Sequence, residues 1–105
     1  MPRRLPELGR FSDPALLILS SLAGGPKHGY AMMEDIDEFS GTHLEPGTLY
    51  GAIERLEQRG WIEPLPNEER RRPYRITAAG ATALQEQLAT MSRIVATGQR
   101  RLQAT

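Results

Sequence analysis

The sequence predicts a mainly α-helical fold of the α+β class, in which a β-hairpin separates three short helices from a long C-terminal helix. Apolar residues recur at helical spacing in four segments of the chain. Capping residues, prolines and glycines stand at the ends of those segments, where helices begin and end. A stretch rich in proline and arginine lies between the third and fourth segments, and its turn residues favour a hairpin.

The composition indicates one small globular domain and excludes several classes of site. The chain has 105 residues, of which 39% are hydrophobic and 25% are charged, and its net charge is zero. Without cysteine it can form neither a disulfide nor a thiolate metal site. The only histidines, His28 and His43, lack the H-E-x-x-H spacing, so we expect no metal and no cofactor. The longest apolar run, residues 15–19, is too short to cross a bilayer, and we expect a cytoplasmic protein without a membrane partner.

The first two helices are predicted from their caps and apolar faces. Ser12 or Asp13 can cap a helix over residues 14–22, which is apolar on nearly every side, and residues 23–26 end it. A second helix is expected from residue 28 or 29 to residue 39. Met33 and Ile36 are expected to point inward there, with Met32 and Phe39 beside them, opposite an acidic face. Residues 40–41 end this helix.

The third helix, over residues 46–59, has the clearest pattern. Its inward stripe is Leu49, Ala52, Ile53 and Leu56, at spacings of three and four. Its outward face offers Thr48, Gly51, Glu54, Arg55 and Gln58, with Tyr50 at the edge. Residues 61–65 are then extended, residues 66–69 turn, and residues 70–77 return as a second strand; the prolines confine the first strand to an edge.

The fourth helix begins after Thr77, a good N-cap, and continues to near the C-terminus. Its residues 77, 81, 84, 88, 91, 95, 98 and 102 form a heptad seam with a gap at Gly98. Such a seam needs a partner surface, either a second copy of the chain or the chain's own domain. We expect a homodimer made by Leu16, Leu19, Leu84, Leu88, Met91, Val95 and Leu102.

Several motifs in this order resemble the PadR family of transcriptional regulators. They are H-G-Y at residues 28–30, G-T-L-Y at 47–50, R-L-x-x-x-G-x-I at 55–62 and R-x-Y-x-I-T-x-x-G at 72–80. The resemblance covers about residues 13–84. It implies a winged helix-turn-helix homodimer that usually represses transcription from inverted-repeat operators, in some members under control of a small molecule near the dimer interface. The chain differs from the family in Pro64 and Pro66, in its short fourth helix, and in the position of its only tryptophan, Trp61.

This interpretation predicts three parts of the chain: a basic N-terminal arm (1–12), a winged helix-turn-helix domain (13–77) and a dimerisation helix (78–105). We expect the third helix to enter the major groove of double-stranded DNA, which admits an α-helix. The wing arginines suit phosphate or minor-groove contact, and the start of the second helix suits phosphate. The predicted DNA-binding residues are Lys27, His28, Tyr30, Thr48, Tyr50, Gly51, Arg55, Arg70, Arg71, Arg72 and Arg75. A small-molecule effector, if present, would contact Leu17, Leu84, Leu88 and Met91.

The sequence also bears on two other functions, a protein-binding winged helix and an enzyme. Zero net charge and an acidic second helix are compatible with a winged helix that binds a protein instead of DNA. The third-helix face argues against it, because Thr48, Gly51 and Arg55 suit a groove better than an apolar partner. An enzyme is not expected, because the sequence offers no nucleophile–base pair, no metal cluster and no phosphate loop; residues 24–27 lack the G-K-[ST] ending of one.

Overall fold

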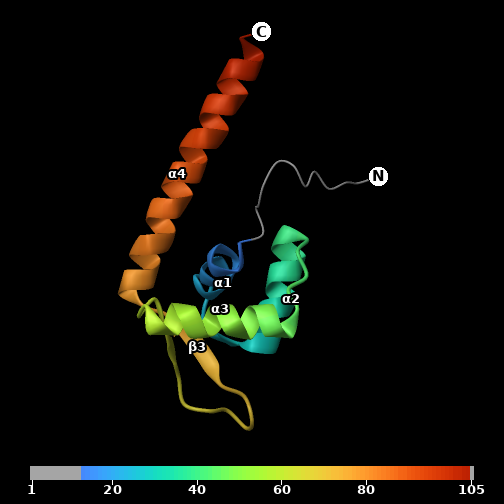
Figure 1. Cartoon of the computed structure of the whole chain (residues 1–105), viewed down its shortest axis with the longest axis vertical. Helices are drawn as coiled ribbons and strands as arrows, with labels where there is room; N and C mark the ends of the chain where they lie inside the picture. Colours follow the sequence, from blue (N-terminus) through green and yellow to red (C-terminus); the bar gives the residue numbers. More distant parts are fainter. Residues whose placement is uncertain (1–12, 105) are drawn as a thin grey trace.

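The computed structural model describes residues 13–104 and contains four helices and a small sheet. In chain order the elements are α1 (Pro14–Leu22), β1 (Lys27–His28), α2 (Gly29–Ser40), α3 (Pro46–Gln58), β2 (Ile62–Pro64), β3 (Pro73–Ile76) and α4 (Ala78–Gln103). Figure 1 shows α1, α2, α3 and the hairpin gathered at one end, while α4 projects from them along the longest axis of the molecule. The predicted mainly helical fold and its hairpin are confirmed.

Local signals set most of the helix ends where the sequence places them. The Asp13 carboxylate accepts a hydrogen bond from the Ala15 N–H, and the Thr77 hydroxyl accepts one from the Gly80 N–H. Gly41 and Gly60 follow α2 and α3 with φ of 73° and 77°, a left-handed conformation that glycine adopts without strain. The predicted arm at residues 1–12, including the alternative cap Ser12, lies outside the described residues.

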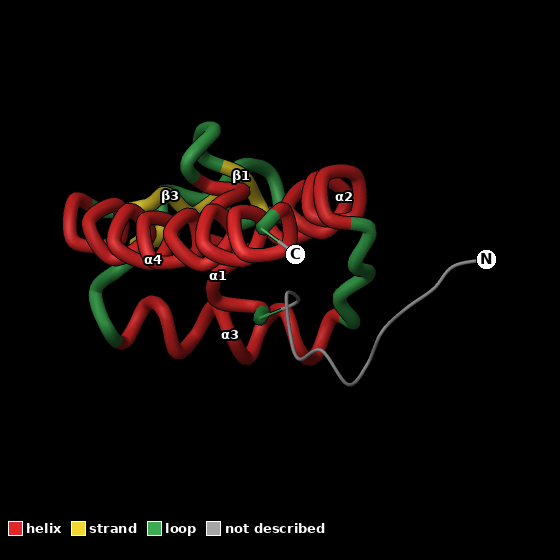
Figure 2. The backbone as a smooth tube through the Cα atoms, turned by 90° about the horizontal axis from the view of Figure 1, so that it is seen from above, coloured by secondary structure: helices red, strands yellow, loops and turns green. Residues whose placement is uncertain are grey.

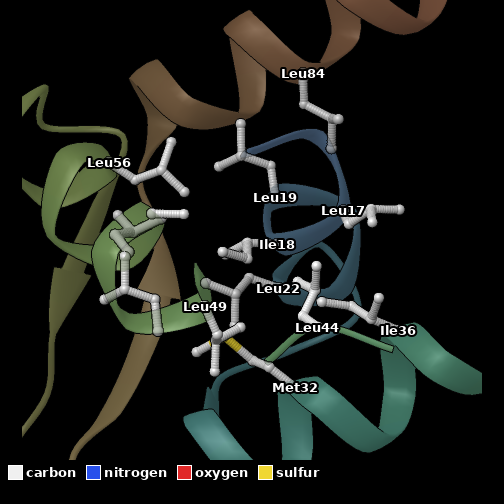
Figure 3. Close-up of a cluster of buried hydrophobic side chains, with 13 residues drawn as sticks. Leu17, Ile18, Leu19, Leu22, Met32, Ile36, Leu44, Leu49, Leu56 and Leu84 are labelled. Atoms are coloured by element: carbon white, nitrogen blue, oxygen red, sulfur yellow. The ribbon is translucent and has the colours of Figure 1, made fainter. Parts of the chain in front are cut away.

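The core lies where α1 meets α2, α3 and the first turns of α4. Figure 3 shows Leu17, Ile18, Leu19 and Leu22 of α1 at its centre, with Leu49 and Leu56 of α3 on one side. The predicted stripe of α3 is confirmed, since all four of its residues are at most 2% exposed. Burial of such apolar side chains is the main stabilising contribution in a domain of this size.

The predicted inward face of α2 was partly wrong. Met32 and Ile36 are both fully buried, and Met33 is half-buried and packs against the core, whereas Phe39 is 49% exposed. Met32 and Ile36 lie four residues apart, so they share one face of the helix, and Met33 is displaced from it by one position.

The sheet contains a strand that the sequence analysis missed. Its order is β1-β3-β2, and β3 pairs antiparallel with both neighbours. Figure 2 shows the sheet beside α2, on the opposite side of α1 from α3. As expected from Pro64, β2 is short and lies at an edge. β1 has only two residues, too few for an alternating pattern, and its His28 is also the N-cap of α2.

The predicted seam of α4 divides into two parts. Leu84 is only 7% exposed because it packs against the core of its own domain. Beyond it Leu88, Val95 and Leu102 are 46%, 55% and 77% exposed. The first turns of α4 therefore belong to the domain, and the remainder projects from it (Figure 1). No helix in residues 13–104 has both the length and the apolar character that a membrane span requires.

Gly80 allows α4 to approach the end of α3 closely. The Thr77 hydroxyl donates to the Gly60 carbonyl, and the Thr77 N–H donates to the Trp61 carbonyl. These bonds bring the first turn of α4 onto the backbone of Trp61. A Cβ on Gly80 would overlap the Trp61 carbonyl, which is backbone and cannot rotate away. The junction therefore requires glycine at position 80.

We predict that Gly80→Ala lowers the free energy of unfolding by about 2 kcal/mol, because it overpacks this junction. Gly98→Ala is the matched control, since nothing lies within 4 Å of a Cβ there. It should stabilise the same helix by about 0.5–1 kcal/mol through helix propensity. Urea unfolding of both variants at one protein concentration measures the two effects. Equal effects of the two substitutions would contradict the proposed close contact.

Candidate nucleic-acid interface

The outward face of α3 presents the predicted groove-reading residues together. Thr48, Tyr50 and Arg55 are exposed on it, and Gly51 is half-buried between them. A Cβ on Gly51 would lie 3.7 Å from the Arg55 guanidinium, so this side chain lies alongside the glycine. The inward residues Leu49 and Ala52 are buried in the core and hold this face outward. The structure therefore brings the four α3 residues onto one surface.

Tyr50 joins this surface to the start of α2. A Cβ on Gly29 would overlap the phenol ring and hydroxyl of Tyr50. Gly29 is buried and is the first residue of α2, so the tyrosine ring occupies the space that a side chain would fill. The glycine of H-G-Y and the tyrosine of G-T-L-Y are thus in contact. Sixteen residues lie between these two motifs in the sequence, which gives no sign of this contact.

The wing is a closed hairpin with a tight tip. The Leu65 N–H donates to the Pro73 carbonyl, and Glu68 and Arg71 exchange two backbone hydrogen bonds. Glu69 begins the two-residue turn with φ of 57°, a conformation for which hairpin turns favour glycine. The turn thus lies at residues 69–70, two positions later than predicted, and exposes the arginines beside it.

The four wing arginines differ in what holds them. Arg75 pairs with Glu63 across the β2–β3 ladder, with 2.6 Å between Nε and the carboxylate. Arg72 donates to the Leu65 carbonyl at 2.9 Å, and Arg71 lies 3.0 Å from the His28 ring. Arg70 makes no side-chain hydrogen bond or ion pair with any residue in 13–104. Among residues 13–104, the wing therefore presents one guanidinium without a side-chain partner and three that are already held.

Three residues at the start of α2 were predicted to bind DNA, Lys27, His28 and Tyr30, and they differ in their contacts and exposure. The Lys27 ammonium donates to the Ser21 carbonyl at 2.6 Å and lies 3.8 Å from the Asp35 carboxylate. Asp35 in turn accepts from the buried Ser21 hydroxyl at 2.7 Å. Lys27 thus joins α1 to α2 within the domain. His28 caps α2, and Tyr30 is 56% exposed beside it.

Tyr74, on β3, is half-buried and packs against the core. Burial raises the pKa of its phenol above the ordinary value of 10.0; the nearby Glu57 carboxylate raises it further, while Arg72 lowers it. The hydroxyl is therefore neutral at physiological pH. The Tyr50 phenol on α3 also raises the pKa of Tyr74 slightly.

A cavity of about 230 Å³ lies where α1, the exit of α3 and α4 meet. Its lining includes Leu16, Leu19, Arg59, Trp61, Leu84 and Gln87. The Arg59 guanidinium stacks over the Trp61 ring at 5.2 Å from its centroid. Of the four residues predicted to bind an effector, only Leu84 lines this cavity, and Leu17 is buried in the core.

Comparison with known proteins decides the family. The model of the PadR-like family of transcriptional regulators matches residues 18–86, about two thirds of the chain. The chain belongs to the PadR-like family. This is a family of DNA-binding transcription factors and not of enzymes. The matched segment contains α3, the wing and the first turns of α4.

Similar proteins support the PadR assignment. A PadR family transcription regulator from Clostridium difficile R20291 is 26% identical, with a TM-score of 0.76 over 85% of this chain and 97% of that one. A transcriptional regulator from Clostridium thermocellum is 29% identical, with a TM-score of 0.72 over 82% of this chain and 89% of that one. An uncharacterized 37.1 kDa protein in transposon TN4556 of Streptomyces fradiae is 42% identical over 81% of this chain. The chain spans a quarter of that relative's length.

The contact between Gly29 and Tyr50 can be tested by a double-mutant cycle. Gly29→Ala should lower the free energy of unfolding by about 1–3 kcal/mol, because the new methyl group displaces the phenol. In a Tyr50→Ala background the same substitution should cost little, since the ring is gone and alanine favours the helix. Chemical unfolding of the four proteins measures the coupling. Additive effects would mean that the two residues do not touch.

Proposed function

We propose that this PadR-like chain represses transcription in the cytoplasm as a homodimer bound to an inverted-repeat operator. The observation that carries the proposal is the division of the molecule into two ends. α3 and the wing lie at one end, and the later turns of α4, whose seam residues are exposed, project toward the other (Figure 1). A DNA-contacting end and an association end fit a dimer that places one α3 in each half-site.

In this proposal α3 reads bases in the major groove. Arg55 is exposed, and its fork suits the two acceptors of guanine, a contact worth about 1–3 kcal/mol in base discrimination. Gly51 lets the backbone approach the base edges, and Thr48 contacts a thymine methyl or a phosphate. Tyr50 directs its hydroxyl toward the start of α2. There it would contact the DNA backbone and help to position the protein on the duplex.

The wing and the start of α2 then hold the DNA backbone. Arg70 is free within residues 13–104 and is the first candidate for a phosphate contact. Arg71, Arg72 and Arg75 contribute by exchanging or sharing their present partners. His28 and Tyr30 border the same surface. Lys27 supports it from within, because its ammonium is engaged by Ser21 and Asp35.

The exposed part of α4 is the proposed dimer interface. Leu88, Met91, Val95 and Leu102 lie on one seam, and their burial against a second copy would remove this apolar surface from water. Leu16 is half-buried at the adjacent edge of α1, whereas Leu19 and Leu84 are already covered by their own core. A small-molecule effector would be held near this interface, and the cavity beside Leu84 offers room for one.

We predict that selection from genomic fragments enriches one inverted repeat, and that Arg55→Ala weakens binding to it by about 1–3 kcal/mol while relaxing the preference at one position. Arg70→Ala should weaken all sequences alike and reduce the slope of log K against log salt by about one. Arg93→Ala, on the exposed side of α4, is the control that leaves both unchanged. Absence of any enriched sequence would instead favour a protein-binding winged helix.

The dimer is tested separately by Val95→Glu and Ala96→Glu. Both side chains are exposed in the chain by itself, but only Val95 lies on the seam. Val95→Glu should raise the dimer dissociation constant at least tenfold, because a buried unpaired carboxylate costs well over 1.4 kcal/mol. Ala96→Glu should change it little. Sedimentation velocity over a concentration series measures both, and equal effects would move the interface away from the seam.

A further inference from the structure

His28 makes two contacts that one neutral imidazole ring cannot satisfy at once. Its Nδ1 lies 3.3 Å from the Ala31 nitrogen, where it can accept the hydrogen bond that caps the first turn of α2. Its Nε2 lies 3.0 Å from Nη1 of Arg71, on the wing. Both partners are donors, since a guanidinium carries only N–H groups. A neutral ring has a lone pair on only one nitrogen, so it can accept one of these bonds at a time.

The two ring tautomers therefore have opposite consequences. With the proton on Nε2, the ring caps α2 and turns an N–H toward the Arg71 N–H. With the proton on Nδ1, the ring accepts from Arg71 and leaves the Ala31 N–H without its cap. A protonated ring can accept neither bond. The cap of α2 and the attachment of Arg71 therefore compete for one lone pair.

The fold imposes this competition. The β1–β3 ladder sets His28 opposite Pro73, two residues from Arg71. The wing turn returns Arg71 toward β1 through its two backbone bonds with Glu68. Within residues 13–104 the Arg71 guanidinium forms no ion pair with a carboxylate, so the ring is its one hydrogen-bond partner there. The ring and the guanidinium are held within reach of each other by backbone pairing.

We propose that His28 is a positioning residue that holds Arg71 at the expense of the α2 cap, and that release of Arg71 to a DNA phosphate moves the ring proton to Nε2 and restores the cap. The second half rests on the proposed DNA-binding function. A phosphate is a stronger partner for a guanidinium than a neutral imidazole, so the exchange proceeds toward DNA. Because the capped turn contains Gly29, which touches Tyr50, wing binding is thereby linked to α3.

The tautomer of His28 can be read directly in the free protein by two-bond ¹H–¹⁵N correlation spectra at pH 8. Wild type should show a major fraction of Nδ1–H tautomer, and Arg71→Ala should shift the ring to Nε2–H without any DNA. The exchange of the Ala31 amide should slow about fivefold in the variant, the factor that corresponds to one helix cap. Arg70→Ala is the matched control, and the His43 signals provide an internal reference. An unchanged His28 tautomer in Arg71→Ala would overturn the proposal.

His28→Asn provides a second background that should remain folded, since asparagine is a good N-cap and is too short to hold Arg71. In the His28→Asn background, Arg71→Ala should leave the exchange rate of the Ala31 amide unchanged. A fivefold slower exchange in that background would show that His28 does not connect Arg71 to the α2 cap. Adding the selected operator to the wild type should give the Nε2–H signals, and a complex that keeps the Nδ1–H form would overturn the exchange. If no DNA binds, the proposed DNA-binding function fails. The tautomer shift of His28 in free Arg71→Ala would still support the competition between Arg71 and the α2 cap.

Discussion

The pairing of β3 with a strand on each side is the constraint on which the candidate interface depends. On one side it sets Glu63 opposite Arg75 and closes the wing; on the other it joins the wing to the two residues that precede α2. α2 begins directly after β1, and its first residue lies against Tyr50 of α3. One strand of four residues thus determines how the wing, the α2 cap and the α3 face lie together.

The elements that local chemistry specifies were predictable from the sequence. α1 and α3 begin at prolines, carry regular apolar faces and end near glycines, so their bounds were predicted to within one residue. β1 was missed because two residues carry no period, and its pairing with β3 is a tertiary event. The error at Phe39 came from a similar source, since α2 is rich in apolar residues on more than one side and only packing decides which of them the core buries.

The residues predicted on α3 lie on one face of the helix, and their contacts with DNA stay a prediction. Thr48, Gly51 and Arg55 share a face because helical spacing alone puts them there. The partners of Lys27, Arg72 and Arg75 depend on strand register and on loop closure, which no short-range pattern reports. A count of arginines along the wing therefore overstates the positive charge that is free to meet a phosphate.

The exposed part of α4 would set the spacing of two DNA-contacting domains in a homodimer. Nineteen residues follow Leu84 in this helix, which at about 1.5 Å per residue extend some 28 Å beyond the core. In a dimer built on that part, this extension and not the domain sets the distance between the two α3 helices. One heptad added or removed there changes the available reach by about 10 Å and leaves every buried residue in place. Half-site spacing and half-site sequence can therefore change independently in such a chain.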